Sequence, residues 1–221
     1  MRTNIKALIV SVLMLASTKA YSIEVVPPPQ SPLDAAPPPT MKSSPASSLL
    51  LGSIAIVFEK TTLGEAMKQI KAGRIQHKED AGESSYWLCY SIPTNAGWEQ
   101  FWLLSHGETG GDDHVIHGVA AKISPYTPPS ASCPALPDEL RPVKLSNGLW
   151  LGSQLEEIRQ KLGEPSLQKK LWFHYASKRE LVGDPRAKDY GTDKIYERGS
   201  VSVCAIKGRV VEIWATKQTA D

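Results

Sequence analysis

Five side chains able to bind a metal lie within a dozen residues: His106, Asp112, Asp113, His114 and His117. Imidazole nitrogens and carboxylate oxygens are common zinc ligands, so His106, Asp112, His114 and His117 form a candidate centre for a metal-dependent hydrolase. In one strand, however, His114 and His117 would point to opposite faces, because side chains alternate. The chain also lacks the HExxH zinc motif. This site is therefore the alternative, and the principal interpretation assigns no metal and no cofactor.

Other catalytic signatures are missing from the sequence. There is no GxSxG elbow, no P-loop and no GxGxxG motif. Most carboxylates neighbour lysine or arginine, as on a solvated surface, and no pair is marked as a general acid and base. We therefore assign no catalytic residue and expect a binding protein rather than an enzyme.

Three cysteines are present, Cys89, Cys133 and Cys204, so one chain cannot pair all of them. Cys133 lies in a proline-rich passage that a disulfide would fix to a strand, and Cys89 is its nearer partner in sequence. Cys89 and Cys133 are the preferred disulfide candidates. Pairing of Cys133 with Cys204, or a free Cys133 with two buried strand cysteines, stays open.

The amino terminus has the pattern of a cleaved signal peptide over residues 1–20. Arg2 and Lys6 precede an apolar run of about ten residues, and small residues precede the expected cleavage after Ala20. The run is about half the length needed to cross a bilayer. We expect a periplasmic or secreted, soluble protein without a transmembrane segment after cleavage.

The charge of the mature chain argues against nucleic acid as a partner. The whole chain carries +2, and removal of the leader, with three cations and no acid, leaves −1. Nucleic-acid binding requires a basic surface. Another protein in the envelope or outside the cell is the expected partner.

Composition divides the mature chain into two folded parts and two proline-rich parts. Residues 21–48 should be a disordered linker, and residues 124–146 a connector. The folded parts are 49–123 and 147–221. In the first, a helix over 63–72 is capped by Thr61 or Thr62, and strands follow over 86–92, 98–105 and 114–123.

The second folded part has a similar pattern. Ser153 and Glu156 have capping-box spacing, a helix over 153–162 ends at Gly163, and a strand over 171–175 precedes a hairpin around Lys207-Gly208. Placing residues 116–123 over 206–213 aligns Gly118 with Gly208. The prediction is an α+β fold of two tandem repeats, each a short helix or helix pair packed on a three- to four-stranded antiparallel sheet.

This pattern resembles the β-lactamase-inhibitor-protein-like fold, which the small lipoprotein of the outer-membrane assembly machinery shares. The resemblance is carried by Gly152, Ser153, Leu155, Ile158, Leu162, Gly163, Pro165, Gly208, Val210 and Ile213. The tandem arrangement is more similar to the inhibitor than to the single-repeat lipoprotein. It departs from the family at Ala72-Gly73-Arg74, where Gly-x-Pro is expected. The resemblance implies helices on one sheet face and an opposite face free to bind a protein, as an inhibitor or an assembly accessory.

Aromatic side chains are the candidate partner-binding residues. If the more aliphatic strand faces meet the helices, the other face of the sheet carries Trp87, Trp98, Trp102, Trp172, His174 and Trp214. Exposed aromatic residues are typical of interface hot spots. The alternative is that several of these tryptophans pack between the repeats or under loops.

Overall fold

The computed structural model describes residues 25–33, 37–80, 83–95, 97–106, 113–125 and 128–220. The predicted signal peptide and Asp112 lie outside these ranges. The elements are β1 (Ser48–Leu51), β2 (Ile54–Val57), α1 (Leu63–Ile70), β3 (Gln76–Asp80), β4 (Glu83–Thr94), β5 (Gly97–His106), β6 (Gly118–Ser124), the 3₁₀ turn η1 (Asp138–Leu140), β7 (Val143–Leu145), α2 (Leu155–Leu162), β8 (Leu167–Lys169), β9 (Trp172–Val182), the 3₁₀ turn η2 (Pro185–Tyr190), β10 (Lys194–Ile206) and β11 (Arg209–Ala220).

Two antiparallel sheets make up most of the fold. The large sheet has eight strands in the order β3-β4-β5-β6-β11-β10-β9-β8, and the small sheet has the order β2-β1-β7. The predicted mixed fold with antiparallel sheets is confirmed. The small sheet was not predicted, because β1 and β7 are short and lie about 95 positions apart in the chain.

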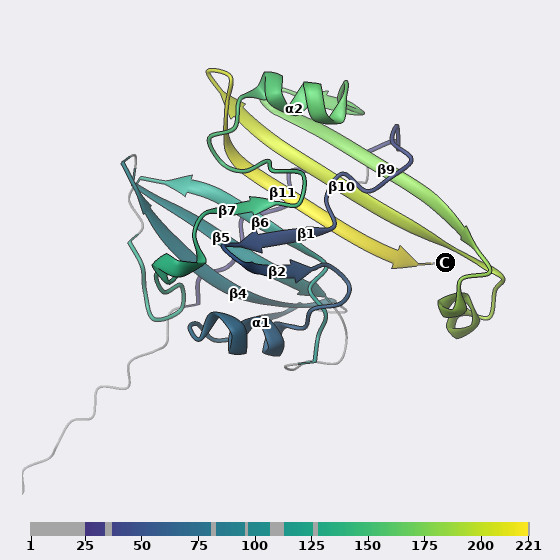
Figure 1. Cartoon of the computed structure of the whole chain (residues 1–221), viewed down its shortest axis with the longest axis horizontal. Helices are drawn as coiled ribbons and strands as arrows, with labels where there is room; N and C mark the ends of the chain where they lie inside the picture. The colour runs from purple at the N-terminus through teal and green to yellow at the C-terminus, as the bar shows by residue number, and fades with distance from the viewer. Residues whose placement is uncertain are drawn as a thin grey trace, which may run out of the picture.

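The helices and the small sheet lie on one side of the large sheet (Figure 1). Alternate side chains of the large sheet face this layer and form the main core with it. Leu88, Phe101, Val119, Ile213 and Val201 contribute one apolar side chain from each of five neighbouring strands. The face with these side chains is called the helix face here, and the other is called the open face.

Helix α1 begins as the sequence predicts. The Thr62 hydroxyl accepts a hydrogen bond from the Glu65 amide, and the Glu65 carboxylate accepts one from the Thr62 amide. The Leu63 amide donates to the His114 carbonyl, 2.9 Å away. Leu63, Ala66 and Ile70 are buried. An eight-residue helix is unstable alone, so this packing against the sheet maintains it.

Helix α2 begins differently from the prediction. Gln154 is the N-cap residue and makes no side-chain capping bond, whereas the Ser153 hydroxyl accepts from the Trp150 amide. The physical reason is a contact with the β10–β11 hairpin: the Leu155 amide donates to the Gly208 carbonyl at 2.8 Å. The hairpin thus satisfies a helix donor that the capping box was expected to serve.

The β10–β11 hairpin confirms the predicted turn. Lys207 and Gly208 both have positive φ, 50° and 75°. A two-residue hairpin with this conformation matches the right-handed twist of its strands. The strands extend well beyond the predicted hairpin, since β10 begins at Lys194 and β11 ends at Ala220.

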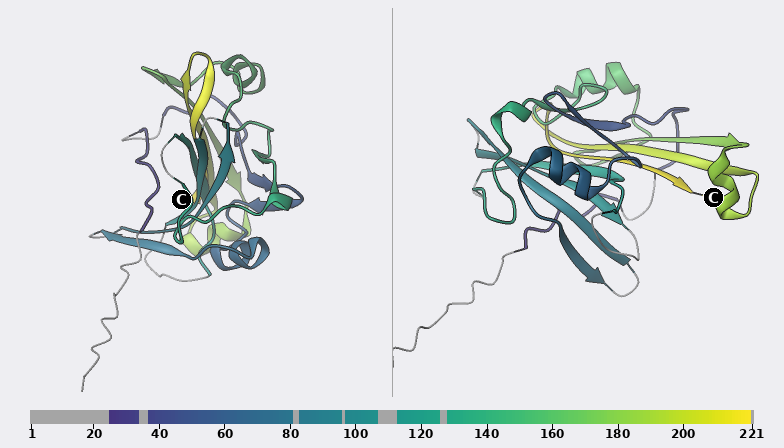
Figure 2. Two further views of the ribbon diagram at one scale, coloured as in Figure 1. Left: turned by 90° about the vertical axis from the view of Figure 1, so that its left-hand side faces the viewer. Right: turned by 60° about the horizontal axis from the view of Figure 1, so that its bottom comes forward.

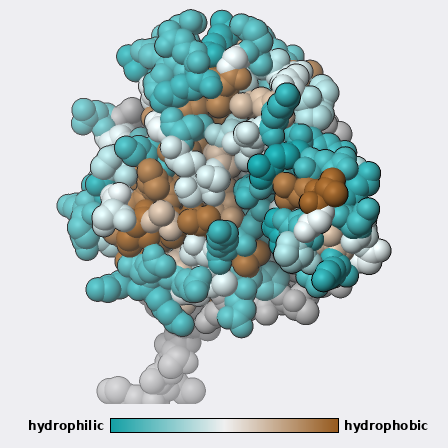
Figure 3. All heavy atoms as spheres, turned by 45° about the vertical axis from the view of Figure 1, so that its right-hand side comes forward, coloured by the Kyte–Doolittle hydropathy of each residue, from teal (hydrophilic) through white to brown (hydrophobic). Residues whose placement is uncertain are grey.

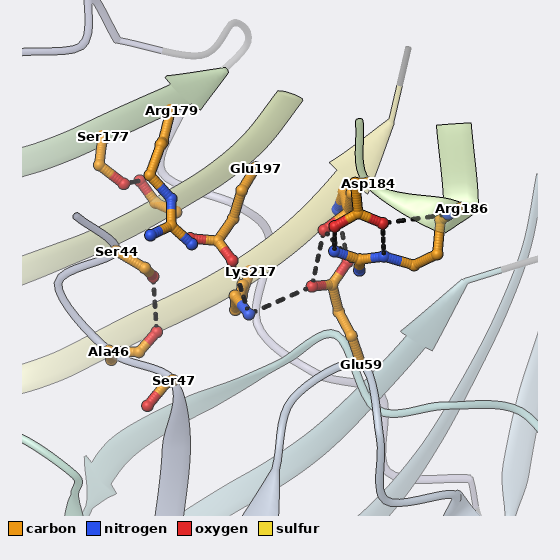
Figure 4. A network of polar contacts seen from close by, with 12 residues as sticks. Ser44, Ala46, Ser47, Glu59, Ser177, Arg179, Asp184, Arg186, Glu197 and Lys217 are labelled. Atoms are coloured by element: carbon orange, nitrogen blue, oxygen red, sulfur yellow. Dashed lines mark hydrogen bonds and ion pairs between the residues drawn. The ribbon is translucent and has the colours of Figure 1, made fainter. Parts of the chain in front are cut away.

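A polar network lies on the helix face of β9, β10 and β11, beyond the apolar core (Figure 4). Glu197 is 8% exposed and pairs with Arg179 and Lys217. Lys217 also pairs with Glu59, whose carboxylate accepts hydrogen bonds from the Thr219 amide and hydroxyl. Pairing of every charge permits this burial, which would otherwise be costly.

The predicted disulfide between Cys89 and Cys133 is present, and Cys204 is a free thiol. The disulfide fixes the connector to the open face of β4. Next to it, the Ser91 amide donates to the Pro134 carbonyl, and the Leu136 amide donates to the Ser91 carbonyl. Among the described residues, no helix is long and apolar enough to cross a membrane.

Loss of this disulfide should lower stability substantially. It closes a loop of 44 residues, for which chain entropy predicts about 3–4 kcal/mol. We expect the Cys89→Ala/Cys133→Ala variant to lose about that much free energy of unfolding, measured by urea titration. Cys204→Ala is the control and should unfold like the parent protein. Equal stability of the double variant and the parent would contradict this assignment.

Candidate functional site

The open face carries a row of side chains that runs across six strands. The strand registers place Cys89 beside Trp102, then Ala120, Trp214, Ser202 and His174. Trp87, two residues before Cys89 on β4, has the same orientation, and Trp172 stands beside His174 on β9. Trp98, four residues before Trp102 on β5, also has this orientation. The six side chains predicted to share one face of the large sheet therefore do so: Trp87, Trp98, Trp102, Trp172, His174 and Trp214.

Two of these tryptophans are covered rather than exposed. Trp87 and Trp102 are each 1% exposed and form a second core with Cys89, Leu104 and the connector. Trp98, Trp172 and Trp214 are half-buried. Trp214 packs against the edge of the second core and is half-buried, whereas Ser202 and His174, further along the row, are buried.

The cover over Trp87 and Trp102 is the proline-rich segment that begins at Val25. Both indole N–H groups donate to the Val26 carbonyl, at 2.9 and 3.1 Å. The Val26 amide donates to the Gln76 carboxamide oxygen at 2.9 Å. Gln76 also donates to the Ser132 carbonyl, so it joins this segment to the connector. Residues 25–33 and 37–41 are called the arm here.

The arm crosses the open face and then passes around an edge of the sheet. In Figure 2, left, its purple trace lies on the side opposite α1 and the small sheet. At its far end, the Thr40 and Met41 amides donate to the Ala176 carbonyl on β9, at 3.0 and 3.1 Å. Composition predicts a linker without packing, whereas these contacts attach both ends of the described arm to the sheet.

The arm and the open face enclose a cleft of about 1060 Å³. Its roof is formed by arm residues, including Pro27–Pro29 and Pro37–Pro39, and its floor by β3, β4, β5, β6, β11, β10 and β9. Trp87 and Trp214 line it, but Trp98 and Trp172 do not. Figure 3 shows another side of the molecule, where hydrophobic patches are small and separated by hydrophilic side chains.

His174 and Ser202 form a buried polar pair beside this cleft. His174 Nδ1 and Ser202 Oγ are 2.8 Å apart, and both side chains are buried. Burial, and to a lesser extent repulsion from Lys169, lowers the pKa of His174. His174 Nε2 has no hydrogen-bond partner in the part of the chain that the structure describes. A serine–histidine pair acts as a nucleophile when a third group orients the imidazole, and no such group contacts His174 among the described residues.

The predicted metal residues occupy the end of β5 and the segment before β6. His106 Nδ1 is 3.2 Å from the Ser85 hydroxyl, and His114 Nδ1 is 3.4 Å from the Ser105 hydroxyl. Burial lowers the pKa of His117. Neither His114 nor His117 lies within β6. In the described part of the chain, no three His, Cys, Asp or Glu side chains are grouped to hold a metal ion. Asp112 is not described.

Sequence reasoning missed Val26, Gln76 and Ser202 as parts of this site. Val26 directly precedes Pro27–Pro29, and an apolar residue before a proline run was the available signal. Comparison of the chain with models of protein families, with curated proteins and with solved structures finds no match.

Burial of His174 should make stability fall on acidification. The free imidazole has a pKa of about 6.5, and the folded state lowers that of His174. The unfolded chain therefore binds more protons below pH 6.5, and stability falls there by at most about 1.4 kcal/mol per pH unit for this group. We expect His174→Gln to flatten this slope in urea titrations between pH 7.5 and 5.5. The exposed His77→Gln variant should retain the slope, and an unchanged slope in His174→Gln would contradict the prediction.

Proposed function

We propose that this protein is an exported binding module whose open sheet face recognises an extended, proline-rich segment of another envelope or extracellular protein. The observation that carries the proposal is the convergence of two indole N–H groups, from Trp87 and Trp102, on the single Val26 carbonyl. In this proposal, the arm occupies the binding face in the way that the partner's segment would.

The chemistry of this contact matches known recognition of proline-rich peptides. A polyproline II segment has no internal hydrogen bonds, so its carbonyls accept bonds from a partner. Grooves lined with aromatic residues exploit this stiff conformation, because little entropy is lost on binding. Here the donors are indole N–H groups on the face of a sheet, and three consecutive prolines follow the accepting residue.

We also propose that the chain consists of two copies of one helix-and-sheet unit, as in the β-lactamase-inhibitor-protein-like family. Strands β3–β6 and β8–β11 are two meanders that meet at β6 and β11. In the first unit, the Leu63 amide donates to the His114 carbonyl and the Ile116 amide donates to the Thr61 carbonyl. In the second unit, the Leu155 amide donates to the Gly208 carbonyl and the Val210 amide donates to the Ser153 carbonyl in the same way. An isolated antiparallel β-bridge pairs Thr62 with Val115, and an equivalent one pairs Gln154 with Arg209. These matched bonds support a duplication with Leu63 equivalent to Leu155.

Export fits this proposal, because the Cys89–Cys133 disulfide is of the kind that persists in oxidising compartments. Inhibition of an exported enzyme and assistance in envelope assembly are two roles that such a face can serve. The metal-dependent hydrolase gains no support from the described residues.

A peptide titration tests the proposed recognition. A synthetic peptide of residues 21–33 should bind a mature chain that lacks those residues and shift its tryptophan emission to shorter wavelength. Replacing Pro27–Pro29 of the peptide by alanine should weaken binding about tenfold, because the free peptide then loses its stiffness. Trp87→Phe/Trp102→Phe in the protein keeps the ring bulk, removes both donors and should also weaken binding. Equal binding of the two peptides would refute recognition of a polyproline segment.

Crosslinking in cells tests for a separate partner protein. A photoreactive residue at position 214, inside the cleft, should capture a protein that contains a proline-rich segment. The same probe at the exposed Tyr190 on η2 is the matched control. Excess peptide of residues 21–33 should abolish capture at position 214 only. Capture that the peptide does not affect would count against this face as the binding site.

A further inference from the structure

The cleft beneath the arm has a floor of small side chains. The registers place Leu104 beside Gly118, then Thr216, Ser200 and Ala176, and all of them line the cleft. A Cβ at Gly118 would collide with the Ala215 carbonyl oxygen. Ser200 and Thr216 satisfy each other through a 2.8 Å hydrogen bond. The side chains of this row are therefore short, and the hydroxyl groups of Ser200 and Thr216 are already hydrogen-bonded to each other.

Apolar groups border this floor above and on one side. Trp214 stands on the neighbouring row of the sheet, Trp87 lies at the β4 end, and the prolines of the arm form the roof. At about 1060 Å³, the space is at the upper end of the range for small-molecule sites. Its shape and lining suit a flat or extended apolar body.

The other side of the floor is cationic. Arg198 on β10 and Lys178 on β9 are directly opposite each other, both exposed, and both line the cleft. Like charges opposite each other on one face destabilise a sheet. Among the described residues neither has an ion-pair partner, although the Lys178 ammonium lies 3.9 Å from the centre of the Tyr196 ring. An anion between them would relieve this repulsion.

The charge of the whole lining has the same sign. Arg198 and Lys178 both line the cleft, and no carboxylate does among the described residues. Lys217 contributes no net charge, because its ammonium is paired with Glu59 and Glu197 on the helix face. The positive side of the cleft is notable in a mature chain whose predicted net charge is −1.

We propose that this cleft binds an amphipathic organic anion, whose apolar body lies over Thr216 and Ser200 and whose acidic group lies between Arg198 and Lys178. The arm forms the roof of this site. This inference goes beyond peptide recognition, although both use the cleft, because the hydrogen bonds to the Val26 carbonyl come from Trp87 and Trp102 and not from the row between Gly118 and Ala176.

A matched pair of fluorescent probes tests the proposal on the full mature chain. 1-Anilinonaphthalene-8-sulfonate carries a sulfonate, and N-phenyl-1-naphthylamine has the same ring system without it. We expect one sulfonate probe to bind per chain, at least tenfold more tightly than the neutral probe. Arg198→Gln/Lys178→Gln should weaken the sulfonate probe about tenfold and leave the neutral one unchanged, because only charge-assisted contacts are lost.

Lys188→Gln/Lys207→Gln removes two exposed charges outside the cleft and should leave both probes unaffected. Ser200→Phe fills the floor and should abolish binding of both. If Ser200→Phe does not fold, the two double glutamine variants still test the proposal, because positions 178, 188, 198 and 207 are all exposed and tolerate substitution. Equal affinity for the two probes, or equal effects of the two double variants on the sulfonate probe, would overturn the proposal.

Discussion

A wide antiparallel sheet has two faces, and here both carry large apolar side chains that must be kept from water. On the helix face, α1, α2 and the small sheet form an ordinary second layer. On the open face, Trp87, Trp102 and Leu104 are buried without any helix or strand above them among the described residues. The cover consists of proline-rich chain instead, and the architecture of the site follows from that.

Proline-rich chain makes an unusual cover because it supplies few backbone donors and forms no ladder of its own. Its attachment depends on a small number of specific bonds. The connector is held by the Cys89–Cys133 disulfide and by Ser91, and the arm by the Val26 carbonyl and the Thr40–Met41 contact with β9. A cover attached at few points can be exchanged for a similar segment at low cost, which links the packing of this face to its proposed role.

Much of the fold was predictable wherever local signals agreed with the final packing. The Thr62 capping box, the Lys207-Gly208 turn and the aromatic strands β4 and β5 all follow from neighbouring residues. The Ser153 capping box failed because the hairpin carbonyl of Gly208 supplies the bond instead. The alignment of Gly118 with Gly208 also differs from the bonding pattern, since Gly208 occupies a turn with positive φ and Gly118 a close strand contact.

The candidate site was predictable in its side chains and not in its cover. Alternation along strands predicts one face for Trp87, Trp102 and Trp214, because the period of a strand is fixed by backbone geometry. No local sequence pattern predicts that the Val26 carbonyl accepts hydrogen bonds from Trp87 and Trp102, or that Arg198 lies opposite Lys178. Both depend on contacts between residues distant in sequence. The short helices, the main hairpin and the aromatic strand faces follow from the amino-acid sequence, because each of them depends on near neighbours in the chain. Which indoles are buried and where a cleft remains follow from the folded chain alone, because burial depends on contacts between segments that are distant in sequence.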